Sequence, residues 1–334
     1  MSPTNAAEYT DERAGVAPLV TVDFARLEQR NPAETARLLK ACTTHGFFYL
    51  DFSSSARAHG IVEDKEKVLR FMKDYFAQPF DMKMEDHRNI RTRGFIPVGT
   101  FTGVDKDSKE CFEHLALARD ELAYSDGVVP RAVEDQRELF ERYLGLNEYA
   151  TTTILSILSD VFSVEEAERF ERHHHANEPS DTILAMLSYP SNGTTHNKHT
   201  DIGSLTILFS HEWGLQVVAP ETGKWEFVEP RPDHGIINVG DVLRFLSGKK
   251  LNSCLHRVVR ATGKYETPHR YSLAFLLRPE DTLRIADVED RAISAKEWHD
   301  RKYEIYAASH DEQETNQVLT GGMEKLLARP IAVA

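Results

Sequence analysis

Apolar residues recur every three to four positions through much of the first half of the chain, which is the spacing of a helix with one buried face. Three segments have this pattern: residues 32–45, 62–76 and 132–162. Gly46 follows the first of them, where glycine commonly ends a helix, and the apolar run at 47–51 predicts a short strand. Residues 94–103 are rich in glycine, proline and aromatic side chains and follow neither period, so we expect an ordered loop or an irregular strand there.

After residue 178 the pattern changes to short apolar runs of β character that are separated by turns. The expected strands cover eight ranges: 183–189, 205–209, 215–219, 225–228, 236–239, 242–246, 256–259 and 271–277. Residues typical of turns separate several of these strands, at 190–193, 220–223, 240–241 and 261–263. Eight is the number of strands in a jelly roll, and beyond residue 294 the composition becomes helical again.

These elements predict a mainly β protein with helical additions, of the α+β class, around a double-stranded β-helix, which is the cupin-like jelly-roll core. We expect a flexible tail at residues 1–15, a largely helical region at 16–178 that packs on the core, the jelly roll at 179–285, and a helical C-terminal tail at 286–334. No internal repeat, low-complexity segment or flexible linker interrupts the sequence, so these parts are expected to form one compact unit.

The composition argues against several functional classes. The chain of 334 residues is 41% hydrophobic, which is enough for a core of ordinary size, yet no apolar run approaches the roughly 20 residues of a membrane helix. Acidic residues outnumber basic ones 53 to 40, and the net charge of −13 argues against nucleic acid as a partner. We therefore expect neither a membrane nor a nucleic-acid partner.

The cellular setting is expected to be the cytoplasm. The first fifteen residues are polar and lack the apolar stretch of a secretory signal. Cys42, Cys111 and Cys254 are too few and too scattered for a disulfide framework or a thiolate metal site, which fits a reducing compartment. No feature of the sequence indicates an obligate protein partner.

One group of residues has the composition of a metal site. His199 and Asp201 are two positions apart, and in an extended segment this spacing directs both side chains to the same face. His256 follows after enough chain for several strands to return to the same place. Two histidines and one carboxylate form a facial triad, which suits Fe(II) because three coordination positions stay open for co-substrate and oxygen. A closed structural zinc site would require a fourth protein ligand.

A His-x-Asp pair alone is weak evidence, because a chain with 15 histidines contains such pairs by chance. His310 and Glu312 form a similar pair, but their segment has helical composition, and side chains two positions apart on a helix diverge. Arg270 and Ser272 strengthen the first site, because they project from one face of a predicted strand and an arginine inside a barrel needs an anion. The alternative role for Arg270 is an ordinary salt bridge.

The order His-x-Asp, distal His and Arg-x-Ser closely resembles the 2-oxoglutarate- and Fe(II)-dependent dioxygenases related to isopenicillin N synthase. Three further motifs carry the resemblance: Gly214-Leu-Gln-Val217, Asn238-Val-Gly-Asp241 and Leu255-His-Arg-Val258. Near the start of the chain, Pro18-Leu-Val-Thr-Val-Asp23 and Thr44-His-Gly-Phe-Phe-Tyr-Leu50 resemble that family's N-terminal region, which caps the jelly roll. The resemblance spans most of the chain.

The resemblance implies a non-haem iron dioxygenase that uses 2-oxoglutarate and O2 and that ascorbate stimulates. It implies that His199, Asp201 and His256 are the catalytic iron ligands. It also implies that Arg270 and Ser272 bind the distal carboxylate of 2-oxoglutarate, while the keto acid end of the co-substrate chelates the iron.

A third co-substrate contact is implied for Tyr189, which matches a tyrosine that hydrogen-bonds 2-oxoglutarate in relatives. An ordinary half-buried strand aromatic would look the same in the sequence. Leu215 and Val217 either line the pocket or belong to the core, and we favour the core for Leu215. The role of these three side chains is therefore open from the sequence.

Some positions depart from the pattern of the family. Leu187 stands where plant relatives often place an asparagine that helps to hold the co-substrate, and Ser210 stands where a glutamine is frequent. Residues 247–252 replace a common Asn-Gly turn before the distal histidine. None of these positions is a predicted metal ligand. They bear on the substrate side of the site, so the identity of the substrate does not transfer.

The expected activity is oxidation of an unactivated C–H bond in a mostly apolar small molecule, with release of succinate and CO2, in natural-product biosynthesis. Hydroxylation, desaturation, epoxidation and rearrangement are all open outcomes. Two alternative functions remain. An oxidase similar to isopenicillin N synthase would use no 2-oxoglutarate, and its Arg270 and Ser272 would bind a carboxylate of the substrate. A catalytically silent jelly-roll binding protein would need none of the five site residues.

Overall fold

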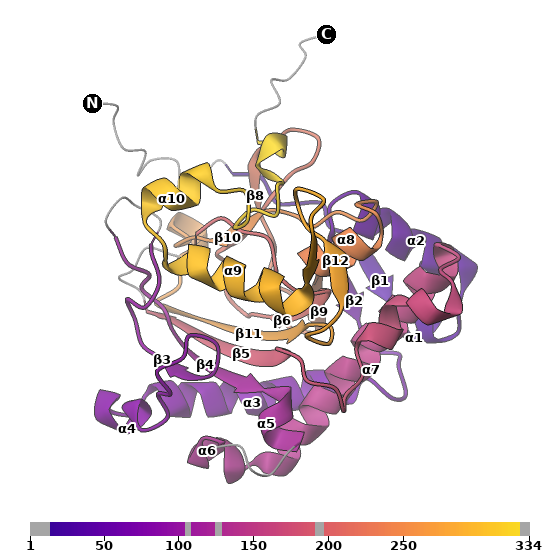
Figure 1. The fold of residues 1–334 in the computed structure, drawn as a ribbon. Helices are drawn as coiled ribbons and strands as arrows, with labels where there is room; N and C mark the ends of the chain where they lie inside the picture. Colours follow the sequence, from indigo (N-terminus) through magenta and orange to yellow (C-terminus); the bar gives the residue numbers. More distant parts are fainter. Residues whose placement is uncertain (1–13, 104–107, 124–128, 191–196, 328–334) are drawn as a thin grey trace.

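The computed structural model describes residues 14–103, 108–123, 129–190 and 197–327. Its central feature is a sheet of eight strands in the order β1-β2-β9-β6-β11-β5-β4-β3 (Figure 1). A second sheet has three strands in the order β10-β7-β8, and β12 pairs with β13 in a separate ribbon. Most of the flexible tail predicted at 1–15 lies outside the described residues.

The strands are short, and antiparallel pairs dominate both larger sheets. The large sheet consists of β1 (Thr21–Asp23), β2 (Phe47–Asp51), β3 (Gly94–Ile96), β4 (Glu113–Ala118), β5 (Ile183–Pro190), β6 (Leu205–Phe209), β9 (His234–Val239) and β11 (His269–Leu277). The other strands are β7 (Leu215–Val218), β8 (Trp225–Phe227), β10 (His256–Val258), β12 (Arg284–Ala286) and β13 (Ala292–Ser294). Seven of the eight predicted strands are confirmed, and each begins and ends within two residues of its predicted bounds.

Two long helices, α3 (Gly60–Phe76) and α7 (Arg137–Val161), cover one face of the large sheet, where they contact β5, β6 and β11 (Figure 1). The C-terminal helices lie on the opposite side. The remaining helices are α1 (Phe24–Glu28), α2 (Pro32–Thr43), α4 (Phe80–Met84), α5 (Arg119–Ala123), α6 (Arg131–Glu134), α8 (Asp241–Leu246), α9 (Ala295–Ala307) and α10 (His310–Thr315). The predicted helices at 32–45 and 62–76 are confirmed as α2 and α3, and the one at 132–162 is divided between α6 and α7.

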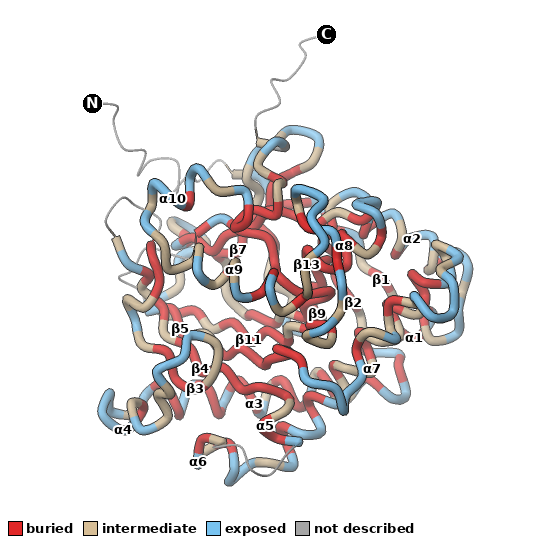
Figure 2. The backbone as a smooth tube through the Cα atoms, viewed as in Figure 1, coloured by how far each residue is buried: buried red, intermediate tan, exposed pale blue. Residues whose placement is uncertain are grey.

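The alternation of side chains along β11 separates the core from the site. Leu273, Phe275 and Leu277 are buried in the hydrophobic core between the sheet and the helices. The residues between them point to the other face, because neighbouring side chains of a strand alternate. Figure 2 shows the buried backbone that runs through this central region. One strand therefore contributes both to the core and to a cavity on the opposite face.

Four strands of the large sheet come from the region before residue 178. β1 and β2 extend one edge next to β9, and β3 and β4 extend the other edge next to β5. The predicted boundary between residues 178 and 179 therefore divides a continuous sheet. The loop predicted at 94–103 begins with β3, so its first three residues are strand.

The strand predicted at 242–246 is wrong, because this segment forms helix α8. Val242 and Phe245 pack in a cluster with Trp298, whereas Leu243 belongs to the main core. A short helix that is buried on two sides is apolar nearly all round. Over five residues, such a run cannot be distinguished from a buried strand by its period.

Gly46, which links α2 to β2, has a φ of +67°, and a Cβ there would lie 1.9 Å from the carbonyl oxygen of Asn252. Gly46→Ala is therefore expected to lower the free energy of unfolding by about 2–4 kcal/mol, from the left-handed backbone and the overlap together. Chemical denaturation measures the change. The matched control is Gly248→Ala, since Gly248 has a φ of +64° with nothing near its Cβ position, and we expect about 1–2 kcal/mol. Equal losses in both variants would contradict the role of the close contact.

Two expectations about the chain as a whole can be compared with the structure. Among the helices of the described residues, none combines the length and the hydropathy that crossing a bilayer requires. Cys42, Cys111 and Cys254 are all free thiols. This agrees with the prediction that the cysteines form no disulfide framework.

Candidate metal and co-substrate site

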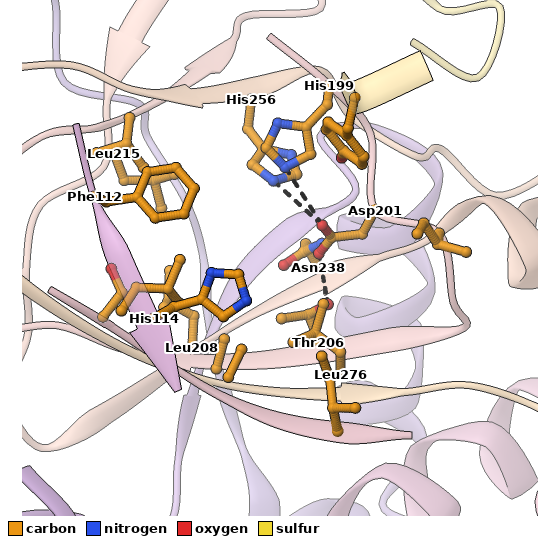
Figure 3. Close-up of a pocket in the computed structure, with 18 of the residues that line it drawn as sticks. Phe112, His114, His199, Asp201, Thr206, Leu208, Leu215, Asn238, His256 and Leu276 are labelled. Atoms are coloured by element: carbon orange, nitrogen blue, oxygen red, sulfur yellow. Dashed lines mark hydrogen bonds and ion pairs between the residues drawn. The ribbon is translucent and has the colours of Figure 1, made fainter. Parts of the chain in front are cut away.

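The three predicted metal ligands lie side by side and point toward one another (Figure 3). His199 precedes β6 and pairs with His256 of β10 through two backbone hydrogen bonds, of 3.0 and 2.9 Å. This isolated pair places the centres of the two imidazole rings 4.2 Å apart. Asp201 Oδ1 lies 3.7 Å from His199 Nε2 and 3.5 Å from His256 Nε2. All three side chains are buried.

Backbone carbonyls hold the two histidines in the orientation that metal binding requires. His199 Nδ1 lies 2.7 Å from the carbonyl oxygen of Asn197, and His256 Nδ1 lies 3.1 Å from that of Cys254. A proton on each Nδ1 satisfies these contacts, and each Nε2 then faces Asp201. There Nε2 carries a proton toward the carboxylate when the imidazole is charged, and it offers its lone pair to a metal when the imidazole is neutral. This arrangement of the second ring nitrogen is typical of metal-binding histidines.

Asp201 is held by two neutral donors from adjacent strands. Thr206 Oγ1 and Asn238 Nδ2 each donate a hydrogen bond of 2.6 Å to Asp201 Oδ2, so that Oδ1 faces the two histidines. Burial opposes the charged form, but His256 and His199 favour it, and the pKa of Asp201 lies well below its usual range. The residue is therefore a carboxylate and an acceptor for a cation. Sequence reasoning missed the roles of Thr206 and Asn238.

The donor set fits a facial triad. In the described part of the chain, no fourth histidine, cysteine, aspartate or glutamate joins the group formed by His199, Asp201 and His256. Two imidazoles and one carboxylate on one side leave the other coordination positions open, which suits Fe(II) rather than a closed structural zinc site. Iron binding by these residues stays a prediction, and their convergence supports it.

A buried ion pair lies behind the triad. Lys302 of α9 is completely buried and donates hydrogen bonds to Asp241 and, at 2.7 Å, to the hydroxyl of Thr200. Thr200 stands between the ligands His199 and Asp201, so α9 is tied to the segment that carries them. Burial lowers the pKa of Lys302, and the neighbouring Asp241 opposes this shift.

Lys302→Met is expected to lower the free energy of unfolding by about 3–5 kcal/mol, because the carboxylate of Asp241 would stay buried without its partner. Thermal and chemical denaturation measure the loss. Lys296→Met is the matched control on the same helix, because the side chain of Lys296 is 41% exposed and pairs with Asp300 on the surface. We expect at most about 1 kcal/mol for the control, and a similar value for Lys302→Met would show that the buried pair contributes little.

Arg270 and Ser272 line a cavity together with the triad. Nη1 of Arg270 donates a hydrogen bond to Ser272 Oγ, whereas its buried Nε and Nη2 find no hydrogen-bond partner among the described residues. Burial lowers the pKa of Arg270. Buried guanidinium nitrogens are normally satisfied, so two orphaned ones next to a cavity fit a ligand carboxylate.

Tyr189 lies beside this arginine, and its ring centre is 5.1 Å from Arg270 Cζ. Burial raises the pKa of Tyr189 to about 12, so its phenol is protonated at neutral pH. The structure therefore brings Tyr189 to the predicted co-substrate position. Whether it hydrogen-bonds 2-oxoglutarate or only packs against Arg270 stays a prediction.

The cavity has a volume of about 140 Å³, counted as the space that the centres of water molecules can reach. Its walls are mostly apolar. Leu215 and Val217 both belong to a buried hydrophobic cluster, which confirms the core role favoured for Leu215. Leu215 also lines the cavity. Aromatic side chains come from three segments distant in sequence: Phe101, Phe112, Tyr303 and Tyr306. The ring of Tyr306 lies next to the triad, with its centre 5.6 Å from that of His199.

His114 of β4 also lines the cavity, and sequence reasoning missed it. Its ring stacks on Phe101 and Phe112, with ring centres 6.3 and 5.9 Å apart. Burial lowers the pKa of His114 to about 4, so the imidazole is neutral at pH 7. Across the portion of the chain that the structure describes, its Nδ1 has no hydrogen-bond partner.

Comparison with protein families finds two matches along the chain. The model of the 2OG-Fe(II) oxygenase superfamily matches residues 180–279. The model of the N-terminal region of non-haem dioxygenases in morphine synthesis matches residues 19–131. The first match contains all six residues predicted at the site, including Tyr189.

Curated fungal proteins are similar over nearly the whole chain. The oxidoreductase vrtI of Penicillium aethiopicum is 41% identical over 317 residues, which cover 93% of this chain and 76% of vrtI. The 2-oxoglutarate-dependent dioxygenase frbH of Dothideomycetidae sp. (strain 11243) is 38% identical over 319 residues, which cover 94% and 98% of the two chains. The 2-oxoglutarate-dependent dioxygenase gloE of Glarea lozoyensis is 39% identical, with coverages of 94% and 95%.

Solved structures share the fold at low sequence identity. A full-length protein of Neurospora crassa, solved in complex with alpha-KG, has a TM-score of 0.69 at 20% identity, covering 87% of this chain and 96% of that protein. A 2OG-Fe(II) oxygenase family protein from Caulobacter crescentus has a TM-score of 0.70 at 21% identity, with coverages of 87% and 99%. These similarities confirm the predicted double-stranded β-helix core.

Proposed function

Because the chain belongs to the 2-oxoglutarate- and Fe(II)-dependent oxygenase superfamily, we propose that His199, Asp201 and His256 hold its iron. The observation that carries this assignment is the convergence of two Nε2 atoms and one carboxylate oxygen. The other polar atom of each side chain, Nδ1 of each histidine and Oδ2 of Asp201, is held by a hydrogen bond. One end of each ligand is thereby fixed, and Nε2 of His199, Nε2 of His256 and Oδ1 of Asp201 face one another.

Arg270 and Ser272 are proposed to hold the distal carboxylate of 2-oxoglutarate. The two orphaned nitrogens of Arg270 match the two oxygens of a carboxylate, and the Ser272 hydroxyl supplies a further hydrogen bond. Tyr189 packs beside them, and its phenol O–H is proposed to donate a hydrogen bond to the same co-substrate. Leu187, which pairs with Ser272 across the sheet, offers only apolar contact there.

Bound iron, 2-oxoglutarate and O2 would supply the oxidising chemistry, in which 2-oxoglutarate becomes succinate and CO2. One oxygen atom of O2 would enter succinate, and the other would enter the product in hydroxylation or leave as water in desaturation. The chain itself positions the metal and the substrate and provides a dry cavity. The two histidines and Asp201 fix the place of the metal, and the apolar walls exclude water from it. Hydroxylation is the simplest outcome, and desaturation, epoxidation and rearrangement would begin at the same C–H bond.

The substrate is proposed to be a small, mostly apolar molecule of natural-product biosynthesis. The walls of the cavity are largely aromatic and aliphatic, and the three proposed metal ligands are buried, which supports a small apolar substrate. The relatives with high coverage are fungal dioxygenases and an oxidoreductase. We further propose a cytoplasmic enzyme that ascorbate stimulates and that needs no nucleic acid, membrane or obligate protein partner.

Succinate formation tests this proposal. The purified protein is incubated in air with Fe(II) and 2-oxoglutarate, with and without candidate substrates, and succinate, product and O2 are measured. We expect succinate only when both Fe(II) and 2-oxoglutarate are present, and one succinate for each product molecule. Substrate oxidation that continues without 2-oxoglutarate would instead identify an oxidase similar to isopenicillin N synthase. The absence of any Fe(II)-dependent turnover would favour a catalytically silent binding protein.

A further inference from the structure

The cavity contains a second buried arginine that the proposed co-substrate site does not use. β11 and the residue after it send alternate side chains into the cavity: Arg270, Ser272, Ala274, Leu276 and Arg278. Eight residues of extended chain span about 26 Å, so Arg270 and Arg278 lie at opposite ends of one cavity wall. If 2-oxoglutarate uses the Arg270 end, the other end is free for the substrate.

The buried side chain of Arg278 forms hydrogen bonds but no ion pair with the described residues. The residue is 4% exposed, and its Nη1 donates a hydrogen bond of 2.5 Å to the backbone carbonyl of Asp181. Within the described ranges its buried Nε has no hydrogen-bond partner, as Nε of Arg270 has none. Among the residues that the structure describes, no carboxylate forms an ion pair with Arg278. Burial of an uncompensated guanidinium is costly, which indicates an anionic ligand.

The groups around Arg278 do not supply the missing negative charge. The carboxylate of Asp181 lies 3.2 Å from His299 Nδ1 and 3.6 Å from Lys296 Nζ, so it is directed to α9. His299 Nε2 lies 3.4 Å from Arg278 Nη1, and burial together with Arg278 lowers the pKa of His299 to about 4. A neutral imidazole accepts a hydrogen bond but carries no charge. The described residues thus give the Arg278 guanidinium a carbonyl and an imidazole as partners, but no ion pair.

Arg278 is also close to the proposed metal ligands. A Cβ placed on Gly203 would lie 2.9 Å from Cγ of Arg278, and Gly203 is only two residues after Asp201. On the same wall, Leu276 pairs across the sheet with Thr206, which donates the hydrogen bond to Asp201. A ligand held at Arg278 would therefore reach the triad through a short carbon chain.

From these observations, and resting on the proposed function, we propose that Arg278 binds a carboxylate of the substrate, so that the enzyme oxidises an organic acid at a carbon near that carboxylate. The planar fork of a guanidinium matches the two oxygens of a carboxylate. The aromatic rings of Tyr303 and Tyr306 pack against the apolar body of the acid, and Tyr303 lies 5.9 Å from Arg278 Cζ. Arg278 is thus a specificity-determining residue.

Binding of acids and their neutral amides tests this assignment without turnover. The probes are hexanoate with hexanamide and 3-phenylpropanoate with 3-phenylpropanamide, titrated calorimetrically into the anaerobic protein with Fe(II) and saturating 2-oxoglutarate. Saturating 2-oxoglutarate occupies the Arg270 end. We expect at least one acid to bind the wild-type protein at least about tenfold more tightly than its amide, which is about 1.4 kcal/mol. Equal affinity within each pair would overturn the proposal, whatever the behaviour of any variant.

Arg278→Met removes the charge and keeps most of the apolar stem. We expect it to abolish the preference for the acid, to leave the Kd of the amide within about threefold, and to leave the Kd of 2-oxoglutarate within about threefold. Arg278→Lys should retain part of the preference, and thermal melting verifies that both variants are folded. An unchanged preference for the acid in Arg278→Met would overturn the proposal, as would a loss of 2-oxoglutarate affinity equal to that of Arg270→Met.

Failure of this inference differs from failure of the proposed function. If 2-oxoglutarate does not bind the Fe(II)-loaded wild-type protein, the proposed function is wrong. If 2-oxoglutarate binds but acids and amides bind equally, only the assignment of Arg278 is wrong.

Discussion

Asp201→Ala is expected to lower Fe(II)- and 2-oxoglutarate-dependent succinate formation by more than about 100-fold. Loss of a hydrogen-bond partner of a metal ligand alone typically costs about 10- to 100-fold, and this substitution removes a ligand itself. It removes the only carboxylate of the triad and therefore its negative charge, since the pKa of Asp201 lies well below its usual range. Initial rates at saturating Fe(II) and 2-oxoglutarate measure the effect.

Asp311→Ala is the control for this substitution. Asp311 is exposed on α10, and its loss should leave the rate within about twofold. Asp201→Ala also leaves the donors of Thr206 and Asn238 without their acceptor, so we expect a stability loss of about 1–3 kcal/mol. Circular dichroism and thermal melting separate that loss from the loss of catalysis. A folded Asp201→Ala protein with more than half of the wild-type rate would contradict the assignment.

Arg270→Met is expected to raise the Kd of 2-oxoglutarate by about 30-fold or more. Removal of one partner from a buried, hydrogen-bonded charge pair costs about 2–5 kcal/mol, and tenfold corresponds to about 1.4 kcal/mol. Arg270→Lys should have an intermediate effect, because it keeps the charge but loses the planar fork. Anaerobic titration of the Fe(II)-loaded protein with 2-oxoglutarate gives the three constants.

Arg278→Met is the matched control, because it removes another buried arginine from the same wall of the cavity. Its Kd for 2-oxoglutarate should stay close to that of the wild type. If Arg270→Met binds 2-oxoglutarate with wild-type affinity, the co-substrate does not use the Arg270 and Ser272 pair.

Much of the fold could be predicted from side-chain periods alone. The apolar runs of β5 and β11 and the helical stripe of α3 are local patterns, and the sequence carries that information directly. The segment 242–246 was misassigned because its burial on two sides is decided by distant elements, including Trp298 of α9. The addition of β1 to β4 to the large sheet likewise depends on long-range pairing, which no local pattern encodes.

The predicted site residues converge in the structure, but the groups that orient them could not be predicted. Thr206 and Asn238 are direct partners across β6 and β9, and both donate to Asp201. Their cooperation follows from the register of two strands, and a single sequence does not specify that register. Arg278 and His114 were missed for a similar reason, because each is an isolated polar residue whose place in the cavity depends on the whole sheet.

The central claim is that one Fe(II) binds to His199, Asp201 and His256. An anaerobic Fe(II) titration of the metal-free protein, with the bound metal measured after separation of free iron, tests it most directly. We expect one Fe(II) per wild-type chain and no binding above background in the Asp201→Ala, His256→Ala double variant, provided that this variant remains folded. Unchanged Fe(II) affinity in the folded double variant would contradict the claim.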